Sequence, residues 1–177
     1  MLWTIGHSTR SASEFLDLLQ AFSIEALADV RRFPTSRRYP HFNQDSLSQA
    51  LAEISIEYVH FPELGGRRQP DPNSRNTLWR NAAFRAYADF METEEFREGM
   101  ERLLELARRK RTAVMCAEAV WWRCHRALLA DYLKSRGIDV IHIVDSQTLS
   151  THPYTSVARQ RAERYSTAPR RLAPSRI

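Results

Sequence analysis

The stretch TAVMCAEAVWWRCHRALLADYLKSRGIDVIHIV, residues 112–144, contains the pattern that decides the fold. Its first five residues, Thr112–Cys116, form an apolar run that predicts a buried strand. A helix is expected from about Ala119 to Arg136, where Gly137 ends it, and Ile138–Val144 predicts a second strand. A strand, a helix and a second strand of these lengths form a right-handed crossover between parallel strands.

The same alternation occupies the preceding part of the chain. Short apolar runs at Leu2–Ile5, Glu25–Val30 and Ile56–Phe61 predict three more strands. Apolar residues at helical spacing predict four helices between the strands, with these inward-facing residues: Phe15, Leu18, Leu19 and Phe22; Leu47, Ala50, Leu51 and Ile54; Phe84, Tyr87, Ala88 and Met91; Phe96, Met100, Leu103, Leu104 and Ala107. We therefore predict an α/β fold, a three-layer α/β/α sandwich around a mostly parallel five-stranded sheet.

The charges are distributed unevenly along the chain. The formal net charge is +5, yet residues 146–177 contain six arginines and one glutamate, which leaves 20 basic and 20 acidic residues in the rest. We predict one α/β domain over residues 1–145 and a basic, partly disordered tail over residues 146–177. A brief helix is expected around Val157–Tyr165, and disorder beyond Thr167.

Composition excludes several classes of protein. The sequence has no apolar run of 18 residues and no signal-peptide pattern at its start, so we predict a cytoplasmic protein without a membrane partner. Two cysteines, Cys116 and Cys124, predict thiols in a reducing compartment rather than a disulfide framework. Their spacing fits none of the usual zinc patterns, and neither a metal nor a cofactor is predicted. The sequence does not indicate an oligomeric state.

Polar residues follow the predicted strands at the edge of the sheet where open α/β folds bind ligands. They are His7 and Ser8 after the first strand, Asp29 and Arg31 at the second, Gly65, Gly66 and Arg67 after the third, Cys116 and Glu118 after the fourth, and Asp145 after the fifth. A purely structural edge needs caps and turn residues, but it does not need a thiol, histidines and arginines. This convergence predicts a functional site.

Cys116 is the foremost candidate for a catalytic residue. A cysteine that ends a buried strand and faces the start of a helix would have its thiolate stabilised by the helix dipole, and would act as a nucleophile. The alternative interpretation is a core residue, because free cysteine is among the most buried residue types. Glu118 is either a general acid or base, or a carboxylate favoured by the first turn of the next helix. A phosphatase loop is disfavoured, since Trp122 occupies the position of its arginine.

His7 and His125 are the candidate bases. The sequence Gly6-His7-Ser8 would place an imidazole beside the thiol, or would form a glycine turn with a polar cap. His125 and Arg126 would reach the edge of the sheet from the predicted helix. Cys124 aligns with the apolar side of that helix, so it is predicted to belong to the core.

Two arginine-rich loops, Arg31–Asn43 and Pro62–Thr77, are candidate binding loops. Fork-shaped guanidinium groups suit phosphate or carboxylate ligands, although charged loops are commonly just solvated. Asp29 and Arg31 either present a carboxylate and a guanidinium to a ligand or form an ion pair with each other. The predicted substrate-binding or anion-binding residues are Ser8, Asp29, Arg31, Gly65, Gly66, Arg67 and Arg126.

Several blocks of the chain together resemble the DUF488 family of bacterial and archaeal proteins. They are Thr4-Ile5-Gly6-His7-Ser8, Asp29-Val30-Arg31, Pro34-x-Ser36, Leu64-Gly65-Gly66 and Met115-Cys116-Ala117-Glu118 leading to Cys124-His125-Arg126. The resemblance extends from about residue 2 to residue 143 and leaves the basic tail unexplained. It implies an α/β fold and draws attention to the polar residues of these blocks, but it attaches no activity to them.

Three functions are open at this point. The leading hypothesis is a thiol-dependent enzyme in which Cys116 is the nucleophile, His7 or His125 is the base, and Arg31 and Arg126 bind an anionic substrate. That substrate would be a small molecule such as a nucleotide, or the end of a nucleic acid. The second hypothesis is a non-catalytic module that binds nucleotides or nucleic acids through its arginine-rich loops and basic tail. The third is a protein-interaction domain with an inactive pocket.

Overall fold

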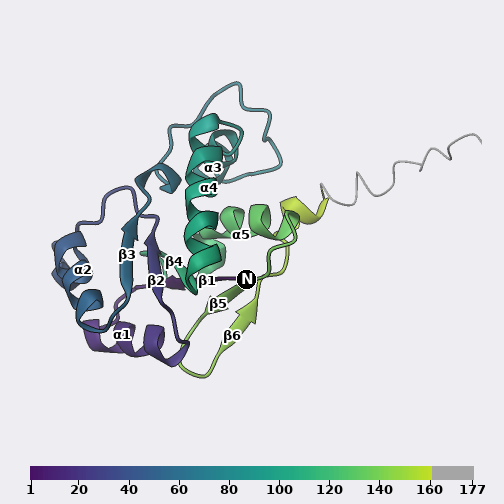
Figure 1. Ribbon diagram of the computed structural model, residues 1–177. Helices are drawn as coiled ribbons and strands as arrows, with labels where there is room; N and C mark the ends of the chain where they lie inside the picture. Colours follow the sequence, from purple (N-terminus) through teal and green to yellow (C-terminus); the bar gives the residue numbers. More distant parts are fainter. Residues whose placement is uncertain (161–177) are drawn as a thin grey trace, which may run out of the picture.

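A six-stranded sheet with the order β3-β2-β4-β1-β5-β6 forms the middle layer of the molecule (Figure 1). Its strands are β1 (Leu2–Gly6), β2 (Ala26–Asp29), β3 (Glu57–His60), β4 (Thr112–Cys116), β5 (Val140–Ile143) and β6 (Leu149–Thr151). The computed structural model describes residues 1–160. The five predicted strands are parallel, which confirms the α/β fold.

The sixth strand is an addition to the predicted sheet. β6 pairs antiparallel with β5 inside the segment that the sequence assigned to the tail. It has three residues, and both Leu149 and Thr151 are exposed, so no hydrophobic pattern marks it as a strand. Residues 156–160 are helical, where a brief helix around Val157–Tyr165 was predicted. Residues 161–165 of the predicted helix and the predicted disorder beyond Thr167 lie outside the described residues.

Helices cover both faces of the sheet and complete the three layers (Figure 1). α1 (Ala12–Ala21) and α2 (Gln44–Glu53) pack on one face, where Trp3 and Ile5 of β1 belong to their core. The other face holds α3 (Ala82–Phe90), α4 (Glu94–Arg109) and α5 (Arg126–Ser135). Leu2 of β1 points to that face, as the period of two in a strand requires.

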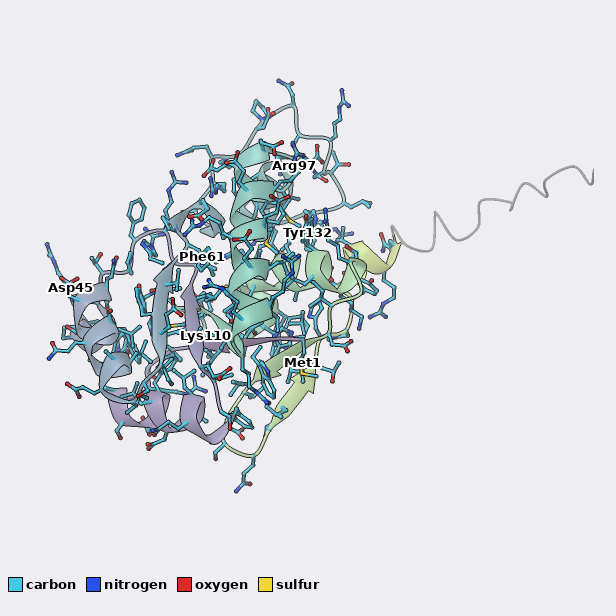
Figure 2. All side chains as sticks on the ribbon, in the orientation of Figure 1. Met1, Asp45, Phe61, Arg97, Lys110 and Tyr132 are labelled. Carbon is cyan, nitrogen blue, oxygen red and sulfur yellow. The ribbon has the colours of Figure 1, made fainter. Side chains whose placement is uncertain are left out.

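Aromatic residues join the helices of the second face to one another and to the sheet. Phe96 of α4 contacts Tyr132 of α5 edge to face, with ring centroids 5.0 Å apart. Phe61 directly follows β3 and is buried in the same core, whereas Arg97 of α4 lies on the solvent side (Figure 2). None of the helices within residues 1–160 is long and apolar enough to cross a membrane.

The helix that follows β4 is shorter than the sequence predicted. α5 begins at Arg126 rather than near Ala119, and a 3-10 turn, η3 (Trp121–Arg123), precedes it. The guanidinium of Arg126 donates hydrogen bonds to the carbonyl oxygens of Glu118 and Ala119. An earlier helix would need those carbonyls for its own backbone bonds. The loop therefore stays open and returns towards the end of β4.

The connections after β1 and β4 leave the sheet in opposite directions. β1 continues into α1 on one face, while the chain after β4 continues into α5 on the other. Gly6 and Cys116, the last residues of these two neighbouring strands, lie side by side in register. In open α/β sheets such a reversal leaves a crevice at the carboxyl ends of the strands, where ligands bind.

Candidate functional site

A pocket of about 820 Å³ opens at this reversal. The loops after β1, β2, β3 and β4 all contribute to its lining, so it includes parts of both predicted binding loops. Its size lies within the range of small-molecule sites. Of the predicted site residues, those that line it are His7, Ser8, Arg31, Gly66, Arg67, Cys116, Glu118 and His125. Asp29, Gly65 and Arg126 lie behind this lining.

The lining is strongly basic, in contrast to the neutral balance of residues 1–145. It contains five arginines, namely Arg31, Arg32, Arg38, Arg67 and Arg123. Glu118 contributes the one acidic side chain among the lining residues. Guanidinium groups gathered around a concave surface attract anions and can bind phosphate or carboxylate oxygens with paired hydrogen bonds.

Two thiols meet at the bottom of the pocket. The Sγ atoms of Cys116 and Cys124 lie 2.7 Å apart, and both residues line the pocket although little of either is exposed. Cys116 is the last residue of β4, and Cys124 lies two residues before the first turn of α5. Cys124 therefore belongs to the site as well as to the core. It reaches the site because it directly follows the η3 turn, which ends at Arg123. The sequence pattern alone predicted a core residue.

The surroundings favour a thiolate on Cys124. Burial by itself would raise the pKa of the Cys124 thiol, but the hydrogen bond from Cys116 and the positive charges of His125 and Arg126 lower that pKa well below its usual range. His125 Nδ1 lies 3.4 Å from the Cys124 sulfur, and the backbone amide of Arg126 donates to it at 3.5 Å. Burial, together with the hydrogen bond to Cys124, raises the pKa of Cys116. Cys116 is thus the thiol donor of the pair.

Arg126 supplies the counter-charge. Its side chain is 1% exposed, and within residues 1–160 no carboxylate lies at ion-pair distance from it. Its Nη2 donates to the Glu118 carbonyl at 2.5 Å, and its Nη1 donates to Thr4 Oγ1 at 3.4 Å. A buried charge is costly unless an opposite charge compensates it. The sulfurs of Cys116 and Cys124 are the nearby groups that can carry a negative charge, and that of Cys124 also accepts a hydrogen bond from the Arg126 amide.

A chain of buried hydrogen bonds continues from Arg126 across β1 and β5, on the face of the sheet that α5 covers, and returns to Asp131 in the same helix. Thr4 Oγ1 lies 2.6 Å from His142 Nδ1, His142 Nε2 lies 2.9 Å from His152 Nδ1, and His152 Nε2 lies 3.0 Å from the carboxylate of Asp131. With both imidazoles neutral, one arrangement of protons satisfies every contact, because Arg126 only donates and the Asp131 carboxylate only accepts. Every donor in the chain then points from Arg126 towards Asp131.

His142 is the centre of this chain. Burial, followed by the electrostatic effects of the neighbouring His152 and Arg126, lowers the pKa of His142 to about 3, so its imidazole is neutral near pH 7. Trp121 stacks on its ring at a centroid distance of 4.5 Å. Sequence analysis missed Thr4, His142, His152 and Asp131. A histidine between Ile141 and Ile143 in a buried strand was the available signal.

His7 occupies the opposite side of the pocket. Its Nδ1 donates to the Ser8 carbonyl at 3.0 Å, and its Nε2 lies 3.4 Å from Arg31 Nη1, from which it accepts. Burial and the positive charge of Arg31 lower the pKa of His7 to about 4. Its ring stacks on Phe42, with centroids 4.3 Å apart. The two ring nitrogens of His7 thus face Ser8 and Arg31, whereas His125 is the histidine beside the thiols.

Asp29 and Arg31 form an ion pair with each other, as one of the two interpretations of the sequence predicted. Arg31 also lines the pocket. The Nε and Nη2 atoms of Arg31 donate to the fully buried carboxylate of Asp29 at 2.6 to 3.1 Å. Tyr58 donates its hydroxyl to the same carboxylate at 2.7 Å, and burial followed by the charge of Asp29 raises the pKa of Tyr58. Asp29 therefore holds Arg31 in place at the edge of the pocket.

Glycines allow the loops of the site to approach one another. A Cβ on Gly6 would overlap the carbonyl group of Glu118, and one on Gly66 would overlap the ring of His125. Gly65 lies against the backbone of Arg32 in the same way. These glycines bring Glu118 and His125 close to the ends of the strands. The glycine pair therefore packs against neighbouring parts of the protein.

Glu118 contributes its backbone more than its carboxylate. Its carbonyl oxygen accepts from Arg126, and its side chain is exposed at the pocket wall. The alternative of a first-turn carboxylate is wrong, because α5 begins eight positions later at Arg126. Among residues 1–160, no group of three or more histidine, cysteine, aspartate or glutamate side chains is arranged to hold a metal ion.

Comparisons with known proteins identify the chain at the level of its family. The family model described as a domain of unknown function, DUF488, matches residues 11–133. No curated protein and no solved structure matches the chain. The matched segment spans α1 to α5 and includes both thiols, Asp29, Arg31 and Arg126. Since that segment is well over half of the 177 residues, this chain belongs to the DUF488 family.

Proposed function

We propose that this protein is an enzyme that uses a cysteine thiolate to attack an electrophilic centre of an anionic substrate. The observation that carries the proposal is the contact between Cys116 and Cys124 beside the buried Arg126, which has no carboxylate of residues 1–160 at ion-pair distance. A thiolate is the reactive form of cysteine, and a nearby cation favours it at neutral pH. Placed in a basic pocket, such a sulfur meets negatively charged substrates.

Each group has a role in this proposal. The sequence pointed to Cys116 as the nucleophile, but the hydrogen bonds favour Cys124 as the thiolate and Cys116 as its donor. His125 lies beside the sulfur, and its Nε2 is buried without a hydrogen-bond partner within residues 1–160. His125 can therefore exchange a proton with the Cys124 sulfur through its Nδ1 atom. Arg31 and the exposed arginines of the loops bind the anion.

The lining also supports a nucleotide as the substrate class. Phe33 lines the pocket among the arginines and is 61% exposed, which is unusual for a large apolar side chain. An exposed aromatic ring can stack on a base while neighbouring guanidinium groups contact phosphates. A nucleotide, either free or at the end of a strand, presents both chemical features to the same pocket.

Thiol alkylation at a series of pH values tests the catalytic proposal. We expect the rate for the native protein to follow a pKa below the ~8.5 of an unperturbed cysteine. Cys116→Ser should retain a reactive thiol, while Cys124→Ser should react slowly near pH 7. Equal, slow alkylation of both variants in their folded state would contradict an activated thiolate. Circular dichroism shows whether each variant is folded.

A non-catalytic module that binds nucleotides is the second candidate, and the five arginines of the lining favour it. In that case binding of a nucleotide weakens steeply with salt, because charge supplies most of the affinity. Replacing both cysteines with serine would then leave nucleotide binding unchanged, and no product would form from any substrate tested. A turnover that disappears in Cys124→Ser would instead support the enzyme.

A further inference from the structure

The two thiols of the pocket are placed for chemistry with each other. They come from different elements, the end of β4 and the residue before the His125 cap of α5, yet their sulfur atoms are in contact at 2.7 Å. Both also line the pocket, so a small reagent can reach them. A nucleophilic thiolate with a second thiol beside it is the arrangement that thiol–disulfide exchange requires.

We propose that Cys116 and Cys124 form a reversible intramolecular disulfide by exchange with a small disulfide molecule that enters the pocket. This inference concerns the same thiols as the proposed function, but it does not depend on any catalytic turnover. The basic lining favours small disulfides that carry carboxylates. Oxidised glutathione is a disulfide of this type and serves as the probe.

The exchange takes place in two balanced steps. The Cys124 thiolate attacks one sulfur of the small disulfide, a mixed disulfide forms, and the first small thiolate leaves. Cys116 then loses its proton to solvent and attacks the Cys124 sulfur, which releases the second small thiolate. The two protein thiols lose two electrons to the small disulfide, which becomes two small thiols once they take up protons.

The contacts of the pair assign the order of these steps. The Arg126 amide donates a hydrogen bond to the Cys124 sulfur, and His125 Nδ1 lies 3.4 Å from that sulfur; both contacts favour the ionised form of Cys124 and make it the attacking sulfur. Cys116 already touches the sulfur that it would attack. The second step therefore needs little movement of either residue, and the mixed disulfide should be short-lived.

Oxidation also changes the charge beneath the pocket. In the reduced pair, a negative sulfur compensates the buried charge of Arg126, whereas a disulfide carries no charge. The guanidinium of Arg126 is then left without a compensating anion within residues 1–160. The oxidised pocket should accordingly attract anions more strongly than the reduced pocket.

Intact-mass spectrometry of the native protein, incubated with oxidised glutathione, provides the test. The chain has two cysteines, so a monomer that has lost two hydrogens can contain only the Cys116–Cys124 disulfide. We expect this species to form without lasting addition of glutathione, and to return to the dithiol when a reducing agent is added. A native protein that stays reduced, or that retains glutathione on one cysteine, would overturn the proposal.

Two variants assign the order of the steps. Cys116→Ser should stop at the mixed disulfide on Cys124, and Cys124→Ser should react at least tenfold more slowly than Cys116→Ser. Equal reactivity of the two folded variants would refute the assignment of Cys124 as the attacking thiol.

Pyrophosphate binding to the reduced and oxidised wild-type protein tests the change in charge, and it should be several-fold tighter after oxidation. Failure to find a substrate for the enzyme would leave all of these measurements unaffected.

Discussion

Two buried arginines on opposite sides of the pocket are neutralised in different ways. Arg31 is held by the carboxylate of Asp29, while Arg126 is 1% exposed and lies beside the thiol pair, with no carboxylate of residues 1–160 at ion-pair distance. A carboxylate is ionised at neutral pH with or without its partner, but a thiol depends on its surroundings for its charge. In the proposed function, Arg31 is thus held in place to bind the anion, whereas Arg126 favours the reactive form of a sulfur.

Among the variants considered, Arg126→Met should have the largest effect on the reactivity of the thiols. Without the guanidinium, the thiolate loses its compensating charge, so the pKa of Cys124 should rise and alkylation at pH 7 should slow by about 10- to 100-fold. Loss of the hydrogen bonds to Glu118 and Thr4 should also lower the free energy of unfolding by about 3 kcal/mol. Stopped-flow alkylation and urea unfolding measure the two effects. Arg126→Lys, which keeps the charge, should recover part of the reactivity, and an unchanged rate in Arg126→Met would remove Arg126 from the proposal.

Arg31→Met is the matched variant on the other side. It leaves the buried carboxylate of Asp29 without its cation, which should lower the free energy of unfolding by about 3 kcal/mol. Thiol alkylation should stay within about twofold of wild type, because Cys124 keeps both His125 and Arg126 beside it. A large loss of thiol reactivity in the folded variant would show that the two arginines act together.

Acid should lower the free energy of unfolding, because His7 and His142, which lie on the two sides of the pocket, are neutral in the folded protein. The pKa values of His7 and His142 are lowered to about 4 and about 3, so the unfolded chain binds more protons than the folded protein between those values and about 6.5. The stability that they contribute is complete above the unfolded pKa and is lost as the pH falls, by up to about 1.4 kcal/mol per pH unit for each imidazole.

Urea unfolding of the wild type, His7→Gln and His142→Gln at pH 7 and pH 5 measures this loss. Each variant should show a smaller decrease in stability between the two pH values than the wild type does. The comparison within each protein separates the histidines from carboxylates, which titrate mainly at lower pH. Equal slopes in all three proteins would mean that neither imidazole is kept neutral by the fold.

The smallest effect is expected from the exposed arginines of the loops. Arg37 and Arg38 are neighbours and both are exposed, but Arg38 lines the pocket and Arg37 is outside its lining. Arg38→Ala should weaken pyrophosphate binding by about three- to tenfold, the size of a solvent-exposed charge contact, and Arg37→Ala should change it little. Isothermal titration calorimetry compares the two. Similar losses in both variants would indicate general attraction by the loop rather than a site.

Much of the fold was predictable because its signals are local. The capping box at Ser11 and the apolar runs of the five parallel strands gave the elements and their order. β6 was missed, since three residues at an exposed edge carry no pattern. The start of α5 was placed too early because Arg126, far along the predicted helix, binds the carbonyls of Glu118 and Ala119 through its side chain.

The location of the candidate site was predictable from the sequence, but most of the contacts within it were not. The rule that ligands bind at the carboxyl edge of parallel strands located the pocket around His7, Arg31 and Cys116. The pairing of Cys116 with Cys124 depends on the path of the loop between them, which no periodicity encodes. The series of hydrogen bonds that ends at Asp131 joins residues more than 100 positions apart, and only the folded sheet brings Thr4 next to His142.

The position of Arg126 beside thiols, with no carboxylate of the described residues as its ion-pair partner, has a consequence for how this sequence can change over time. A chain that replaced Cys124 by a neutral residue would keep the buried cation with Cys116 as its remaining thiol neighbour, and a chain that replaced Arg126 first would keep a less reactive thiol. Each single step costs either stability or reactivity, so the two positions should be inherited together or lost together. The same coupling would oblige anyone who transplants this site into another protein to move the cysteine and the arginine as a pair.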